Sequence, residues 1–187
     1  GLSVPTLGGS GIGYDIAKQF GHHIHQTRAG LVPFTFSDQF KEVTTRLSGN
    51  AVDATLSNDL NSFTEALLFT HRGLSGPSSL QLSNYWDVGQ SFKINFLPYL
   101  DLIDFFKAKK QSQPKVLLRT LLIEHLPKSV VLELQTLIWA ESADIAIGNL
   151  SDDKLEQIAN RLHAFDVKPS GTEGYRTAAV TLGGVDT

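Results

Sequence analysis

Residues 91–98 read Ser91-Phe92-Lys93-Ile94-Asn95-Phe96-Leu97-Pro98, and the chain continues as Tyr99-Leu100-Asp101-Leu102-Ile103. Apolar and polar residues alternate from Ser91 to Leu97, which predicts a strand with one buried and one solvent-exposed face. Pro98 ends this strand, because proline has no N–H to donate to a sheet. Asp101 can cap a helix that begins directly after it. The change from strand to helix at this point decides the fold.

Downstream of this point, residues 101–163 contain almost no glycine, and their apolar residues recur with a helical period. The pattern predicts four helices: one capped by Asp101, one around Leu117–Leu122, one with Pro127 in its first turn and one starting at Ser151. We therefore expect residues 101–163 to form an all-α subdomain.

Before residue 101 and after residue 163, the sequence is typical of strands bounded by turn residues. The predicted strands are Leu31–Phe36, Phe40–Leu47, Ala51–Leu56, Phe63–Phe69, Phe165–Val167 and Tyr175–Leu182. The predicted fold class is therefore α+β. A β-barrel-like body, residues 31–100 and 164–182, would carry the helical subdomain as an insertion.

The first 30 residues combine a glycine-rich loop with a helix predicted from Ser10 to Phe20. Glycines before a helix can let backbone N–H groups approach a phosphate. A dinucleotide fingerprint also needs a buried strand before the glycines, and only Leu2–Pro5 stands there. We therefore expect a tight loop entering a helix rather than a complete nucleotide site.

Composition excludes several classes of protein. The 187 residues are 41% hydrophobic and carry a net charge of −3, so we expect a globular chain without a nucleic-acid partner. No apolar run could cross a bilayer and no basic leader is present, so we expect no membrane and a cytoplasmic location. The absence of cysteine excludes thiol catalysis and Cys-ligated metals. The absence of methionine and the glycine-rich ends predict an interior piece of a longer polypeptide.

A serine lies close to a histidine in the stretch from His71 to Pro77. Ser75 and His71 could form a hydrolase pair, but Pro77 stands where a nucleophile elbow has glycine. A helix beginning at Pro77 and capped by Ser75 is the favoured interpretation. His71 and Arg72 could contact an anion or only fix the turn.

Three further groups of charged residues have simple structural interpretations. His22, His23 and His25 follow a helix end without a nearby carboxylate, so no metal site is predicted. Glu173 and Arg176 could pair across a turn, or Arg176 could reach a ligand anion. A basic run is interpreted as a solvated helix face, because acidic residues flank it and no aromatic residues interleave it. This run comprises Lys107, Lys109, Lys110, Lys115 and Arg119.

Three stretches together resemble the BaiN-type, aminoacetone-oxidase-like bacterial flavoproteins: Gly1–His22, Phe69–Pro77 and Gly171–Val185. The resemblance implies a parent about twice this length, in which a two-part FAD-binding Rossmann domain surrounds inserted barrel-like and helical domains. This chain would be those insertions, with residues 1–30 bordering the FAD domain. Both main FAD-binding parts would lie outside the chain, so FAD is expected in the parent and no cofactor in this piece.

The resemblance also implies roles for particular residues. Those expected near the cofactor are Thr6, Gly8, Gly11, Gly13, Gly183 and Gly184. Those expected on the substrate side are Thr70, His71, Arg72, Ser75, Tyr175 and Arg176. No catalytic residue is assigned, because the redox chemistry belongs to the cofactor.

The leading hypothesis is thus a substrate-side cap of a bacterial FAD-dependent oxidoreductase that is inactive by itself. Its expected partners are the rest of its own polypeptide and a small-molecule substrate. An interaction or homo-oligomerisation module and a serine hydrolase using Ser75 and His71 are the alternatives.

Overall fold

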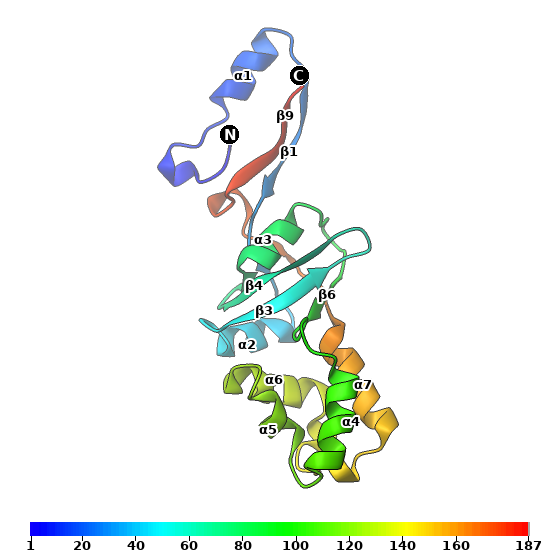
Figure 1. Cartoon of the computed structure of the whole chain (residues 1–187). Helices are drawn as coiled ribbons and strands as arrows, with labels where there is room; N and C mark the ends of the chain where they lie inside the picture. Colours follow the sequence, from blue (N-terminus) through cyan, green and yellow to red (C-terminus); the bar gives the residue numbers. More distant parts are fainter. Residues whose placement is uncertain (187) are drawn as a thin grey trace.

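The structure, a computed structural model, describes residues 1–186 as an elongated molecule with three parts (Figure 1). A two-stranded ribbon with both chain ends lies at one end of the molecule, and an antiparallel sheet lies in the middle. Four helices form the opposite end. The fold therefore combines helices and antiparallel strands, as the sequence predicts.

The middle part is a seven-stranded antiparallel sheet in the order β7-β6-β3-β4-β5-β2-β8. Its strands are β2 (Phe34–Thr35), β3 (Ala51–Ser57), β4 (Ser62–Thr70), β5 (Gly73–Ser75), β6 (Phe92–Asn95), β7 (Phe165–Val167) and β8 (Gly171–Thr172). The two edge strands, β7 and β8, do not pair with each other within residues 1–186. The sheet is therefore barrel-like but open within the described residues.

Alternation along the strands places one face of the sheet in the core. In β3, Val52, Ala54 and Leu56 are buried while the residues between them are more exposed. Phe34 of β2 is fully buried, and its ring lies 4.9 Å from Phe92 and 5.2 Å from Trp86. These aromatic contacts join β2 to β6 and to the segment after α3, which are far from β2 in the sequence.

One predicted strand is wrong: Phe40–Leu47 belongs to helix α2 (Gln39–Arg46). The Asp38 side chain accepts a hydrogen bond from the Phe40 N–H at 3.0 Å and so caps this helix. Val43 and Thr44 are buried on its inner face. Packing and the cap thus override the strand preference of the β-branched residues.

The helical part has the caps that the sequence predicts. Asp101 accepts hydrogen bonds from two amides at the start of α4 (Leu102–Ser112), and Ser151 accepts one at the start of α7 (Asp152–His163). Between them lie α5 (Leu118–Leu122), α6 (Lys128–Ile138) and the 3₁₀ turns η2 (Ala140–Ser142) and η3 (Ile147–Asn149). Apolar faces of these helices and of the sheet form one continuous buried cluster. The two parts therefore support each other's folding.

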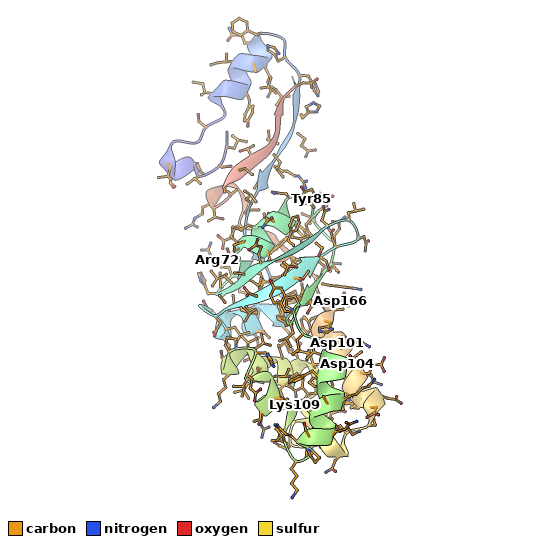
Figure 2. All side chains as sticks on the ribbon, viewed as in Figure 1. Arg72, Tyr85, Asp101, Asp104, Lys109 and Asp166 are labelled. Atoms are coloured by element: carbon orange, nitrogen blue, oxygen red, sulfur yellow. The ribbon has the colours of Figure 1, made fainter. Side chains whose placement is uncertain are left out.

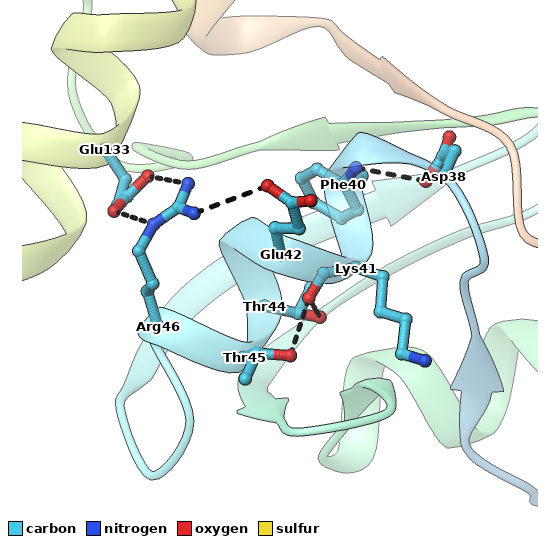
Figure 3. Close-up of polar contacts among 8 residues, drawn as sticks. All are labelled: Asp38, Phe40, Lys41, Glu42, Thr44, Thr45, Arg46 and Glu133. Carbon is cyan, nitrogen blue, oxygen red and sulfur yellow. Dashed lines mark hydrogen bonds and ion pairs between the residues drawn. The ribbon is translucent and has the colours of Figure 1, made fainter.

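An ion pair joins the sheet side to the helical part (Figure 3). Arg46 of α2 donates to both carboxylate oxygens of Glu133 on α6, at 2.6 and 2.9 Å. The hydrogen bond from this bidentate pair raises the pKa of Arg46 above its ordinary value, and the charges of Glu133 and Glu42 add to it. This geometry fixes the relative position of the two elements.

The ribbon pairs the two ends of the chain. Strand β1 (Ile24–Gly30) runs antiparallel to β9 (Val180–Val185), with Ile24 opposite Val185. Helix α1 (Ile12–Gln19) and the 3₁₀ turn η1 (Pro5–Leu7) precede the ribbon. The predicted strand from Tyr175 to Leu182 is correct only from Val180 onward, because Gly174–Arg176 form the 3₁₀ turn η4.

Candidate functional site

The residues implied as cofactor-binding gather at the ribbon end of the molecule. The N-terminal loop is held there by backbone and hydroxyl contacts: Val4 N–H donates to the Tyr175 carbonyl at 2.8 Å, and Leu2 N–H donates to Thr181 Oγ1 at 2.9 Å. The Ser3 and Thr181 hydroxyls lie 3.0 Å apart. Segments from the two ends of the sequence therefore form one surface.

Two glycines at this end are required by backbone contacts. At Gly183, φ is +76° and a Cβ would lie 2.3 Å from the carbonyl oxygen of Gln26, across the ribbon. A Cβ at Gly9 would lie 2.1 Å from the carbonyl oxygen of Ser3. By contrast, Gly8 and Gly13 face open space. The fold explains Gly183 and Gly9 by close contacts and Gly8 by its φ of +95°, whereas Gly13 has neither feature; the open space at Gly8 and Gly13 leaves room for a group from outside.

Helix α1 begins without a side-chain cap, because Gly11 occupies the N-cap position. The first amides of a helix have no intrahelical acceptor, so they can receive an anionic group. Thr6 is exposed on the preceding turn, and Gly184 packs beside the Tyr14 ring. The loop and helix could thus border a cofactor, although within residues 1–186 no strand precedes the loop as a dinucleotide site requires.

The same end exposes an apolar surface that we call the ribbon-end apolar face. Its members are Leu7, Ile12, Ile16 and Phe20, whose exposed fractions are 86%, 67%, 49% and 76%. Neither α1 nor η1 contains a buried residue. The helical period that predicts α1 is correct, but Ile12, Ile16 and Phe20 stay exposed within the described part of the chain, whereas Tyr14 lies against the ribbon. Ile12, Ile16 and Phe20 follow one another at i, i+4 spacing and so lie on one side of α1, and exposed apolar surfaces of this kind are typical of interaction sites.

Two of the substrate-side candidates, Thr70 and Arg72, lie at the turn between β4 and β5 and make contacts there. Thr70 has a structural role, since its hydroxyl accepts from the Gly73 and Arg72 amides and closes the turn between β4 and β5. The Arg72 guanidinium lies 3.8 Å from the Glu173 carboxylate. This ion pair connects the turn, where Figure 2 shows Arg72, to the segment before η4. Glu173 therefore pairs with Arg72, while Arg176 is exposed. The structure thus brings the 70–73 turn close to Glu173 and η4.

Ser75 and His71 do not form a catalytic pair. Ser75 lies in β5 opposite Leu68, whereas His71 is an exposed residue of the preceding turn. No hydrogen bond between their side chains occurs in the described structure. Helix α3 (Pro77–Ser83) starts with Pro77 in its first turn, but its N-cap is Gly76 rather than Ser75. The helix-start interpretation is therefore correct except for the capping residue.

Tyr175 has a feature that the sequence could not reveal. Its hydroxyl oxygen is buried and has no hydrogen-bond partner within residues 1–186. Buried polar groups are nearly always paired, so this hydroxyl is an exception, which it shares with the buried Trp139 Nε1. Tyr175 also supplies the carbonyl that anchors Val4. It thus lies where the N-terminal loop, η4 and the ribbon meet.

The described structure offers no other site of a familiar kind. Across residues 1–186, no three His, Cys, Asp or Glu side chains are grouped so that they could hold a metal ion. His25 lies 3.2 Å from Asp186, and both side chains are exposed. None of the described helices is long and apolar enough to cross a membrane.

The Lys110–Asp152 pair gives a testable pH dependence. A hydrogen bond from Lys110 at 2.7 Å, helped by the positive charge, holds the pKa of the Asp152 carboxyl below its ordinary 3.8. A depressed pKa stabilises the fold above the unfolded-state pKa, and that contribution is lost as the pH falls through the folded-state pKa. Asp152→Asn should therefore slightly lower the midpoint of urea unfolding at pH 7 and leave it unchanged well below pH 3.8. An equal decrease at both pH values would contradict this assignment.

This arrangement defines a class of protein: an antiparallel sheet and a helical unit that share one core and end in a ribbon with an uncovered apolar face. The family described as "HI0933-like protein barrel and H2TH domain" matches residues 28–180. The chain belongs to this family, which is one of flavoproteins. The general class implied by the sequence resemblance is thereby confirmed.

Two curated relatives match the whole chain. Both are named "Ribosomal RNA dihydrouridine synthase", one from Escherichia coli (strain K12) at 46% identity and one from Haemophilus influenzae (strain ATCC 51907 / DSM 11121 / KW20 / Rd) at 44%. The match spans 46% of the length of each relative. The names of these relatives differ from that of the BaiN-type, aminoacetone-oxidase-like flavoproteins that three stretches of the sequence resemble.

Proposed function

We propose that this chain is the inserted, substrate-side part of an FAD-dependent enzyme that reduces uridine to dihydrouridine in ribosomal RNA. The observation that carries the proposal is the 46% and 44% identity, over the entire chain, to relatives with that name. Family membership supports the FAD-associated class. The activity would belong to the longer polypeptide, which we call the complete protein.

In this proposal the three parts of the chain have different tasks. Residues 1–30 border the FAD-binding domain, residues 31–100 and 164–182 form the barrel-like domain, and residues 101–163 form the helical subdomain. The ribbon-end apolar face would be covered by the FAD-binding domain, since a large apolar surface is stabilised when it leaves water. The 187-residue chain would be inactive by itself, because it supplies only one wall of the site.

The residues at the ribbon end fit a bordering role for FAD. The uncapped start of α1 and the open space at Gly8 and Gly13 would let a cofactor approach the backbone. Reduction of the C5–C6 double bond of uridine takes one hydride and one proton, and reduced FAD is the group that would supply the hydride. Arg72 and Arg176 would hold and orient the RNA, because guanidinium groups pair with phosphate, and His71 would lie beside them as a hydrogen-bonding side chain.

This proposal replaces the expectation that nucleic acid is not a partner. That expectation rests on the net charge of −3, which averages over the whole surface. A charge average does not exclude local contacts with phosphate. The proposed RNA substrate is supported by the printed names of the relatives.

A second candidate is a small-molecule oxidase activity of the BaiN-type, aminoacetone-oxidase-like kind. The Phe69–Pro77 and Gly171–Val185 stretches favour it through their resemblance to that family. Both candidates use FAD in the complete protein and differ in the substrate. A role in homo-oligomerisation stays a separate prediction, which light scattering of the purified chain would test.

The test compares the 187-residue chain with the complete protein. We expect the complete protein to show the oxidised-flavin absorbance at roughly 450 nm and the chain to lack it, since the cofactor, not the chain, absorbs there. Incubation of the reduced complete protein with unmodified ribosomal RNA should yield dihydrouridine, measured by mass spectrometry of nucleosides. Flavin-loaded protein that oxidises aminoacetone but forms no dihydrouridine would favour the second candidate and refute the first.

A further inference from the structure

The end of the helical part opposite the ribbon carries a concentration of positive charge that the proposed function has not used. Residues 105–118 contain four lysines and no carboxylate: Lys107, Lys109, Lys110 and Lys115. The first three lie in the C-terminal half of α4, and Lys115 lies in the loop after it. We call these four residues the basic tip.

The start and end of α4 differ in charge. Asp101 and Asp104 lie at its start, close to the sheet, and Lys109 lies toward its other end (Figure 2). Lysines in a last helical turn complement the helix dipole, which accounts for Lys109 and Lys110. It does not account for Lys115, which lies beyond the helix in a segment whose residues 111–115 are all exposed. The charge therefore extends over a larger surface than helix stability requires.

The lysines of the basic tip differ in their internal contacts. Lys110 donates to the Leu150 carbonyl and to Asp152, both at 2.7 Å, so its charge is used within the protein. Lys109 lies 5.5 Å from the centre of the Phe105 ring and makes no ion pair within residues 1–186. Lys107 and Lys115 likewise have no carboxylate within ion-pair distance in the described structure. Three charges thus remain available to a partner.

The surface around these lysines is shaped by a close backbone contact. Gly148 packs against Pro114, where a Cβ would lie 2.7 Å from the Pro114 carbonyl oxygen. This contact fixes the loop beside α4 and leaves a shallow depression of about 450 Å³. Lys107, Lys110 and Gln111 line it, together with Asp152, whose carboxylate is ion-paired with Lys110. Ammonium and amide donors around a depression suit the oxygen atoms of a phosphate group.

We propose that the basic tip binds the phosphate backbone of RNA at a distance from the ribbon end. The inference rests on the proposed function, in which the complete protein acts on ribosomal RNA. The turn that carries Arg72, in the middle part of the molecule, and the basic tip would then contact different parts of the same RNA (Figure 2). The contacts at the basic tip would be independent of RNA sequence, because phosphate contacts position a protein without reading bases.

The experiment uses the complete protein and a variant with Lys107→Gln, Lys109→Gln and Lys115→Gln. Lys110 is left in place because of its internal contacts. The probe is a fluorescein-labelled oligouridylate of about 20 nucleotides, longer than one typical single-strand site, and its binding is measured by anisotropy at several salt concentrations. We expect the Kd at low salt to rise at least about tenfold and the slope of log K against log salt to fall by about 2, as for three lost phosphate contacts.

The matched control carries Lys41→Gln, Lys93→Gln and Lys168→Gln, which remove the same charge from exposed positions of the barrel-like domain. Its Kd should change less than about twofold, because distant exposed charges are screened by salt. Equal weakening in the two variants would overturn the inference, since overall charge would explain it. Competition by polyglutamate rather than by RNA would also overturn it in favour of an acidic protein partner.

The two proposals can fail separately. If the basic-tip variant binds the oligouridylate as wild type does while the complete protein forms dihydrouridine, this inference is wrong and the proposed function stands. If the complete protein forms no dihydrouridine, the proposed function fails whatever the binding data show.

Discussion

Replacing Ile16 and Phe20 with glutamine is expected to leave the free energy of unfolding of the 187-residue chain nearly unchanged and to destabilise the complete protein by roughly 2–5 kcal/mol. Both side chains are largely exposed here, at 49% and 76%, so their removal costs this chain little. If the FAD-binding domain covers them, each contributes burial energy in the complete protein. Urea unfolding of both forms, with and without the substitutions, measures the difference.

The control for this experiment is a pair of equally exposed apolar residues elsewhere. Leu60 and Val88 are 89% and 82% exposed in the loops after β3 and α3. Leu60→Gln with Val88→Gln should change neither form by more than about 0.5 kcal/mol, as is usual for surface substitutions. Identical effects of the two pairs in the complete protein would show that the ribbon-end apolar face is not a domain interface.

Gly76→Ala is expected to destabilise the chain by about 2–4 kcal/mol. Gly76 has a φ of +86°, and a Cβ there would lie 2.6 Å from the Ala66 carbonyl oxygen and 2.8 Å from the Leu68 nitrogen of the neighbouring strand. Both atoms belong to the backbone of β4, so the sheet or helix α3 would have to shift. A thermal or urea unfolding curve of the purified variant measures the loss.

Ser75→Ala is the matched variant for Gly76→Ala. The Ser75 hydroxyl makes no hydrogen bond in the described structure, so this substitution should cost less than about 1 kcal/mol. A Gly76→Ala protein as stable as Ser75→Ala would contradict the close contact with β4. The comparison thus tests whether the fold requires the glycine at position 76 and does not require the hydroxyl at position 75.

Local signals in the sequence predicted a large share of the fold. The Ser91–Leu97 alternation, the Asp101 and Ser151 caps and Pro127 each act within a few residues, and the structure confirms the elements they define. The strand predicted at Phe40–Leu47 was wrong because burial of Val43 and Thr44 on a helix outweighs their strand preference. The strand preference of the individual residues does not show which of them become buried when the chain folds.

The candidate site was less predictable, since it depends on contacts between distant parts of the chain. The pairing of β1 with β9 joins Ile24 to Val185, and no local pattern encodes it. The ion pair between Arg72 and Glu173 and the buried hydroxyl of Tyr175 likewise arise only when the chain is folded. The glycine pattern around Gly8 and Gly13 identified the loop but did not show which glycines the backbone itself requires.

The claim on which this account depends is that the ribbon end is one side of an interface within a longer polypeptide. Amide hydrogen exchange, measured by mass spectrometry on peptides from residues 1–30 and 175–186, tests it in both the 187-residue chain and the complete protein. We predict fast exchange of α1 in the chain and protection that increases at least about tenfold in the complete protein, as expected when an exposed helix becomes packed. Equal exchange rates of α1 in the two forms would contradict the claim.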